Sequence, residues 1–146
     1  MELEEFLRDW DIGESELRRV SWRRQYRDLL LRIDLVRDRR RPADPTDPLG
    51  FLHSVTGDLI FVACARVCFD KSLYYVDSDI RWGVAARTII AIAEDETRWS
   101  DREDLTDGQL KHYALELDDR WPGEHRSWLH VVCRDLAFNV IGPTGP

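Results

Sequence analysis

Hydrophobic and polar positions alternate in blocks along this chain, which predicts a protein built mainly from β-strands. The most apolar block covers residues 58–69, where ten of the twelve residues are uncharged and apolar. Gly57 precedes the block and the turn-forming residues 70–72 follow it. Continuous apolarity is typical of a strand that is covered on both faces, so we expect one central strand here.

Six other stretches have strand patterns, at residues 15–22, 28–36, 72–77, 82–93, 109–118 and 127–141. The alternation is clearest in 28–36, where every second residue from Leu29 to Leu35 is apolar. Residues 15–22 fit a helical turn as well as a strand, and we interpret them as a strand that pairs with 28–36. The Arg134-Asp135 pair interrupts the last stretch and indicates a bulge in a single long strand.

Residues 1–12 predict an N-terminal helix, because the apolar residues between Leu3 and Trp10 share one helical face. A helix this short must pack against the sheet to persist. Three prolines and three consecutive arginines make 37–50 a mobile loop. The tail 142–146, with two glycines and two prolines, is not expected to join the sheet.

The predicted fold class is α+β, as one domain of 146 residues with a mainly antiparallel sheet of about seven strands and a short N-terminal helix. Hydrophobic residues make up 43% of the chain, which is enough for a core. No apolar run approaches the roughly 18 to 20 residues that span a bilayer, and the acidic N-terminus does not resemble a secretion signal. We therefore expect a cytoplasmic protein.

Three cysteines, Cys64, Cys68 and Cys133, have no C-x-x-C spacing. On one strand Cys64 and Cys68 would lie about 13 Å apart, too far for a disulfide. We expect three reduced, buried thiols, as is usual in the cytosol. Nucleophilic use of Cys133 is the alternative.

The net charge of -7 is unevenly distributed. Residues 18–41 contain ten arginines and three aspartates, whereas residues 94–107 contain seven acidic residues and two arginines. Solvated faces and cross-strand ion pairs are the simplest interpretation of both runs. An acidic chain is a poor candidate for nonspecific nucleic-acid binding, so no nucleic-acid partner is expected.

The last two predicted strands carry His112, Glu116 and His130. If Asp118 lies opposite Trp128, Glu116 faces His130, and His112 lies on the same side of the sheet. A carboxylate beside an imidazole can act as an acid-base pair or supply metal ligands. Ordinary cross-strand pairs explain the same residues, so no metal site is assigned. Nucleotide-binding and hydrolase motifs are absent, and no cofactor is expected.

The last sixty residues carry a strand with His112 and Glu116, a polar turn, and a strand that contains the phrase from Val132 to Phe138. An early SELRRV is followed by LLLRIDLV. Together these features resemble small bacterial β-rich domains of the YxiG-like kind and immunity proteins of polymorphic toxin systems. The resemblance implies a single cytosolic domain and, for the immunity group, a protein that binds and blocks a toxin.

The leading hypothesis is a non-enzymatic bacterial binding protein, of the toxin-neutralising or accessory kind, that acts through protein-protein contact. Acidic surfaces bind basic partners rapidly, so the acidic stretch and an aromatic turn would form the contact surface. The predicted contact residues are Glu94, Asp95, Glu96, Trp99, Asp101 and Trp121. The alternatives are a metal-dependent enzyme that uses His112, Glu116 and His130, and a protein that holds an apolar ligand between the sheet and the helix.

Overall fold

The computed structural model describes residues 1–37, 54–70, 87–94, 110–119 and 125–143. In this part of the chain one helix is followed by eight strands. They are α1 (Leu3–Asp9), β1 (Trp10–Arg23), β2 (Asp28–Arg37), β3 (Ser54–Val62), β4 (Arg66–Asp70), β5 (Arg87–Glu94), β6 (Lys111–Asp119), β7 (His125–Cys133) and β8 (Asp135–Pro143). The predicted fold class is confirmed as a single, mainly β domain. The described part of the chain contains no helix with the length and apolarity to span a membrane.

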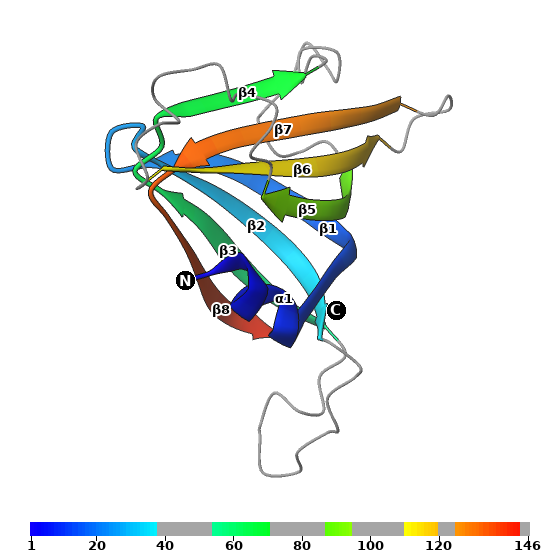
Figure 1. Cartoon of the computed structure of the whole chain (residues 1–146). Coiled ribbons are helices and arrows are strands. Elements are labelled where there is room, and N and C mark those ends of the chain that lie inside the picture. The colour runs from blue at the N-terminus through cyan, green and yellow to red at the C-terminus, as the bar shows by residue number, and fades with distance from the viewer. Residues whose placement is uncertain (38–53, 71–86, 95–109, 120–124, 144–146) are drawn as a thin grey trace.

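The strands form one antiparallel sheet in the order β4-β7-β6-β5-β1-β2-β3-β8 (Figure 1). After a bend at 63–65, β3 continues into β4, and after a bend at Arg134, β7 continues into β8. Since β3 pairs with β8 and β4 pairs with β7, the two bends lie side by side. Ala65 N donates to Val132 O over 2.7 Å across them. The sheet is thus folded into a first leaf (β1, β2, β3, β8) and a second leaf (β4, β7, β6, β5), which meet at the bends (Figure 1).

The hydrophobic core lies between the two leaves. The alternate residues of β2 predicted to share one side, from Leu29 to Leu35, are completely buried. The second leaf contributes alternate residues of β6 and β7 that are also buried, namely Tyr113, Leu115, Leu117, Leu129, Val131 and Cys133. The period of two that defines a strand therefore directs one face of each leaf into the same interior.

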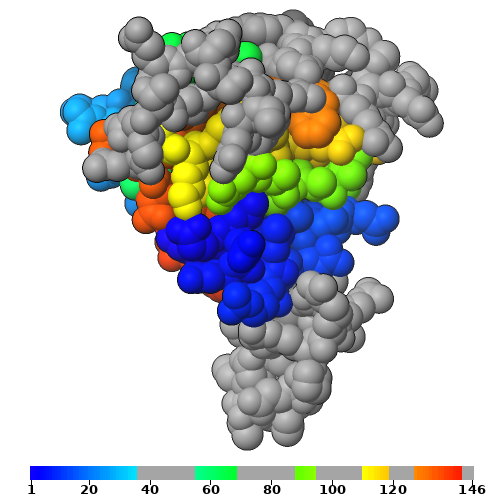
Figure 2. All heavy atoms as spheres, in the orientation of Figure 1, coloured from blue at the N-terminus to red at the C-terminus, as the bar shows by residue number. Residues whose placement is uncertain are grey.

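Helix α1 is confirmed, although it ends at Asp9, three residues before the predicted end at residue 12, and β1 begins directly at Trp10. Its residues Leu3 and Phe6 are buried in the core. The Phe6 ring packs against the Phe138 ring of β8 with 5.1 Å between centroids. The N-terminal residues, dark blue in Figure 2, lie against the green atoms of β5. Lys111 joins the two elements through Glu2 and Glu94, which lie 2.6 and 4.0 Å from its Nζ.

The prediction of one central strand over 58–69 is wrong. The run forms the end of β3, a bend and β4, and β4 lies at an edge of the sheet. The bend begins at Ala63, whose φ of 55° is left-handed. Its N–H donates to the buried carboxylate of Asp28 over 3.0 Å, and Cys64 N donates to Arg27 O over 2.7 Å. Contacts with the β1–β2 turn therefore set this bend, and the apolar run itself does not reveal it.

The prediction of a single long strand over 127–141 is also wrong, because Arg134 separates two strands that have different partners. The prediction that residues 142–146 stay outside the sheet is wrong at two positions. Gly142 and Pro143 extend β8 and lie opposite Thr56 and Val55. A proline is tolerated here because an edge strand needs hydrogen bonds on one side only.

The remaining predicted strands are confirmed where the structure describes them. Residues 15–22 belong to β1, which pairs with β2 as expected, and the other three correspond to β2, β5 and β6. The described residues form eight strands, because six of the seven predicted strands are described and two of these, 58–69 and 127–141, are each divided by a bend. The predicted strand at 72–77 and the predicted loop at 37–50 lie outside the described residues, apart from Arg37, which ends β2.

Candidate functional site: an acidic cleft on the outer face

Two strand irregularities lie next to each other on the sheet. The pairing of β1 with β2 shifts register between Asp11 and Glu16, and the pairing of β5 with β6 shifts between Ile89 and Ala91. The two strands are neighbours, because residues 15–17 of β1 pair with residues 87–89 of β5. Irregularities of this kind change the direction in which side chains point, and they are frequent beside functional sites.

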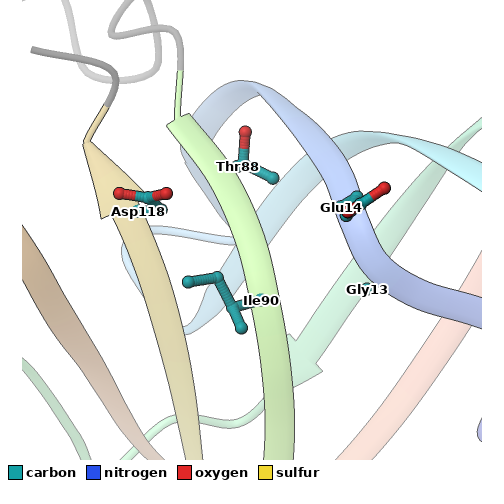
Figure 3. A pocket seen from close by; sticks show the side chains of 5 residues that line it. All are labelled: Gly13, Glu14, Thr88, Ile90 and Asp118. Carbon is teal, nitrogen blue, oxygen red and sulfur yellow. The ribbon is translucent and has the colours of Figure 1, made fainter.

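An open cleft of about 540 Å³ lies at these irregularities, on the outer face of the sheet. Its lining residues are Gly13, Glu14, Thr88, Ile90 and Asp118 (Figure 3). Glu14 comes from β1 and Asp118 from β6, so the two carboxylates flank β5, which contributes Thr88 and Ile90 (Figure 3). Two acidic groups therefore border a space that also has an apolar side chain and a hydroxyl.

The backbone of β1 explains how Glu14 reaches this position. Glu14 has a φ of 63°, a left-handed conformation that is uncommon for residues other than glycine. The preceding Gly13 donates its N–H to Asp11 Oδ1 over 3.0 Å. A Cβ at position 13 would lie 3.2 Å from that oxygen and 3.7 Å from Ile90 O. The contact with Ile90 O would be an ordinary one, so the tighter contact at position 13 is with the Asp11 carboxylate that accepts the Gly13 N–H.

The lining suits a cation with an apolar stem, such as an arginine or lysine side chain. Carboxylates accept charge-assisted hydrogen bonds from guanidinium and ammonium groups, and the stem of such a side chain packs on aliphatic groups such as Ile90. Within the described ranges, no group of three or more His, Cys, Asp or Glu residues is arranged to hold a metal ion.

The structure brings two of the predicted site residues together elsewhere on the outer face. His112 Nε2 lies 3.1 Å from His130 Nδ1, and both side chains are buried. The Trp128 ring stacks on His130 with 6.3 Å between centroids. At this contact one of the two ring nitrogens carries the hydrogen and donates it, and the other accepts it.

The predicted pairing of Glu116 with His130 is wrong, because the register differs by two residues from the one assumed. Ala114 lies opposite His130, and Glu116 lies opposite Trp128. A shift of two keeps every residue on its own face. The prediction that His112, Glu116 and His130 share one face therefore holds, whereas the expected contact between Glu116 and His130 as opposite residues does not.

The predicted partner-binding residues lie mostly outside the described ranges. Of the six, only Glu94 is described, and it ends β5 as an exposed residue near Lys111. Asp95, Glu96, Trp99, Asp101 and Trp121 fall in segments that the structure does not describe. The acidic stretch 94–107 therefore remains a prediction.

In the described part of the chain, arginines from residues 18–41 form ion pairs with aspartates. Arg24 holds the buried Asp28 through two hydrogen bonds, and Arg18 contacts Asp34 on the neighbouring strand. Arg32 contacts Asp58 of β3, with 2.9 Å between Nε and Oδ1. The interpretation made from the sequence, cross-strand ion pairs, is confirmed for Arg18–Asp34 and Arg32–Asp58, whereas Arg24–Asp28 lies within the β1–β2 turn.

The three cysteines are free, but they are not equally buried. Cys133 is buried, Cys64 is partly buried, and Cys68 on the edge strand β4 is exposed, so the expectation of three buried thiols is wrong for Cys68. Burial raises the pKa of the Cys64 thiol to about 11 and shifts the pKa of Cys133 in the same direction. Both thiols are therefore mostly protonated at neutral pH, so any reaction of either thiol as a nucleophile is slow there and becomes faster at higher pH.

The cleft residues Glu14 and Asp118 were not identified from the sequence. The available signal was the isolated glycine at position 13, directly after the helix predicted over residues 1–12. An irregularity within a strand explains an isolated glycine equally well.

Comparison of the chain with models of known protein families and with curated protein sequences gives no match.

Proposed function

We propose that this chain is a non-enzymatic binding protein of the bacterial cytosol that holds a basic protein partner through the acidic cleft. The observation that supports the proposal is the position of Glu14 and Asp118 on either side of β5, around an open space with Ile90 in its lining. A partner arginine or lysine would insert its charged group between the two carboxylates.

The charge of the whole chain supports the same kind of partner. A net charge of -7 attracts a basic protein over a distance and speeds its association, while the cleft determines where the contact forms. The acidic stretch 94–107 begins at Glu94, the last residue of β5, and β5 also contributes Thr88 and Ile90 to the cleft. The resemblance to immunity proteins makes a basic toxin domain the first partner to test.

The test measures association and dissociation rates between the full chain and a toxin domain encoded by a neighbouring gene. Glu14→Gln with Asp118→Asn removes both cleft carboxylates. We expect the affinity to fall by at least about tenfold. The main change should be faster dissociation, because the loss of a partly desolvated charged contact raises the dissociation rate.

The matched control is Glu4→Gln with Glu5→Gln, which changes the net charge equally on the exposed side of α1. We expect this control to slow association slightly and to leave dissociation unchanged. Equal effects of the two double variants would show that only net charge matters and would reject the cleft as the contact.

Replacing Glu94, Asp95 and Glu96 by neutral residues tests the neighbouring stretch, with slower association expected at low salt.

The alternative function, a metal-dependent or acid-base enzyme, is favoured by one observation, the hydrogen bond between His112 and His130. Elemental analysis of protein purified without a histidine tag separates the two functions. Stoichiometric zinc, iron or manganese that is lost in a His112→Gln variant would favour the enzyme over the binding protein.

A further inference from the structure

Two cysteines that are 69 residues apart in the sequence meet where the sheet bends. Cys64 lies in the bend between β3 and β4, and Cys133 is the last residue of β7, directly before the bend into β8. On one side of the bends Val62 lies opposite Asp135, and on the other Ala65 N donates to Val132 O over 2.7 Å. The register changes by one residue across the bends: between the hydrogen bonds from Arg134 N to Val62 O and from Ala65 N to Val132 O, residues 63 and 64 lie opposite Cys133.

The surroundings of the two thiols agree with this register. Cys133 belongs to the buried core, and Cys64 packs against that core. The Cys64 thiol lies 3.3 Å from Phe61 O, and the Cys133 thiol lies 3.4 Å from Asp135 O. Burial raises the pKa of Cys133 and the charge of Cys64 raises it further, which agrees with two thiols in the same part of the core.

We propose that Cys64 and Cys133 are a site of reversible disulfide formation that ties the two leaves of the sheet together at their bends. Cys64 and Cys133 lie between two backbone hydrogen bonds of 3.0 and 2.7 Å that join the two bends, and a disulfide needs Cβ atoms about 3.5–4.5 Å apart. A small local adjustment therefore closes the bond, whereas the exposed Cys68 lies further along β4, opposite His130.

The oxidant is a small-molecule disulfide, such as oxidised glutathione. The Cys64 thiolate attacks one sulfur of this molecule and forms a mixed disulfide, and one glutathione thiolate leaves. The Cys133 thiolate then attacks the Cys64 sulfur and the second glutathione thiolate leaves. The two protein thiols are oxidised, the glutathione disulfide is reduced to two thiols, and the two protons pass to the departing thiolates.

The first experiment uses the full chain with Cys68→Ser, so that the exposed thiol cannot compete. The protein is incubated with oxidised glutathione at pH 9, alkylated and examined by intact mass and peptide mapping. We expect a product that is 2 Da lighter than the reduced chain, takes up no alkylating agent, and yields a peptide pair joined through Cys64 and Cys133. The melting temperature should rise by about 10 °C, because the bond closes a long loop.

The second experiment repeats the equilibration in 8 M urea and in native buffer. Folding brings the two thiols together, so we expect the equilibrium constant for bridge formation to be at least about tenfold larger in native buffer. The matched control, Cys64→Ser with Cys68→Ser, should show no rise in melting temperature. A bridge that forms equally well in urea, or glutathione adducts without a bridge in the native chain, would overturn the proposal.

Discussion

The ring of Phe138 on β8 occupies the space directly over Gly57 on β3. A Cβ added at position 57 would lie 2.4 Å from Phe138 Cζ and 2.5 Å from Cε2. The same ring packs against Phe6 of α1 and against Trp10, with centroids 5.1 and 5.5 Å away. The missing side chain of Gly57 thus makes room for the aromatic group to which the N-terminal helix attaches.

We predict that Gly57→Ala destabilises the protein by about 2–3 kcal/mol, because the ring held by Phe6 and Trp10 must move. Urea unfolding measures this change. Gly142→Ala is the matched control, since a Cβ there meets nothing within 4 Å, and it should change stability by less than about 0.5 kcal/mol.

A double-mutant cycle identifies the cause of this loss. Phe138→Leu shortens the side chain over position 57 and destabilises the protein on its own. Combined with Gly57→Ala, it should cost less than the sum of the two single changes, because the clash is then absent. Additive costs would show that Gly57 acts through the backbone and not through the ring.

Apolar contacts rather than ion pairs should hold α1 on the sheet. Phe6→Ala removes a buried ring and should cost about 3–4 kcal/mol in urea unfolding. Lys111→Gln removes the ion pair with Glu2, whose carboxylate is mostly exposed, and should cost less than about 1 kcal/mol. A larger loss for Lys111→Gln than for Phe6→Ala would contradict this account of the helix.

The stability of the fold should decrease in acid through Asp28. Hydrogen bonds from Arg24 lower the pKa of this carboxyl below its usual value of 3.8, and the Ala63 N–H lowers it further, against the opposing effect of burial. Because the pKa is lower in the folded state, the stabilisation is complete above the unfolded-state pKa. It is lost as the pH falls through the folded-state value.

The variant Asp28→Asn cannot ionise at this position. We expect it to be less stable than the parent at pH 7, and the difference between the two proteins should shrink steadily below about pH 4. Urea unfolding from pH 7 to pH 2 measures both curves. A difference that stays constant over this range would mean that Asp28 does not contribute to acid unfolding.

The conformation of Glu14 allows stability and binding to be separated. Its left-handed φ of 63° is strained for any residue with a Cβ, so Glu14→Gly should stabilise the protein by about 0.5–1 kcal/mol. Glu14→Ala keeps the strain and should leave stability nearly unchanged. Both variants remove the carboxylate from the cleft, and both should weaken binding of a basic partner. A loss of stability in Glu14→Gly would show that its side chain makes contacts that matter more than the strain.

The sequence predicted those features that depend on the nearest neighbours along the chain. Alternation in 28–36 correctly predicted the buried side of β2, because a period of two directs every second side chain to the same face. The same rule placed His112 and His130 on one face. Register needs a partner strand, however, so the assumed contact between Glu116 and His130 was wrong by two residues.

By itself, the sequence determined the antiparallel β class, the short N-terminal helix and the apolar faces, since each follows from a local period. Only the tertiary structure decided where the predicted strands 58–69 and 127–141 bend, because the bend at Ala63 depends on the carboxylate of Asp28, 35 residues earlier. It also decided that Glu14 and Asp118 border one cleft, and that Cys64 and Cys133 lie at one pair of bends. These relationships join residues that are far apart in the sequence. A local pattern of polar and apolar residues does not encode which of them meet in space.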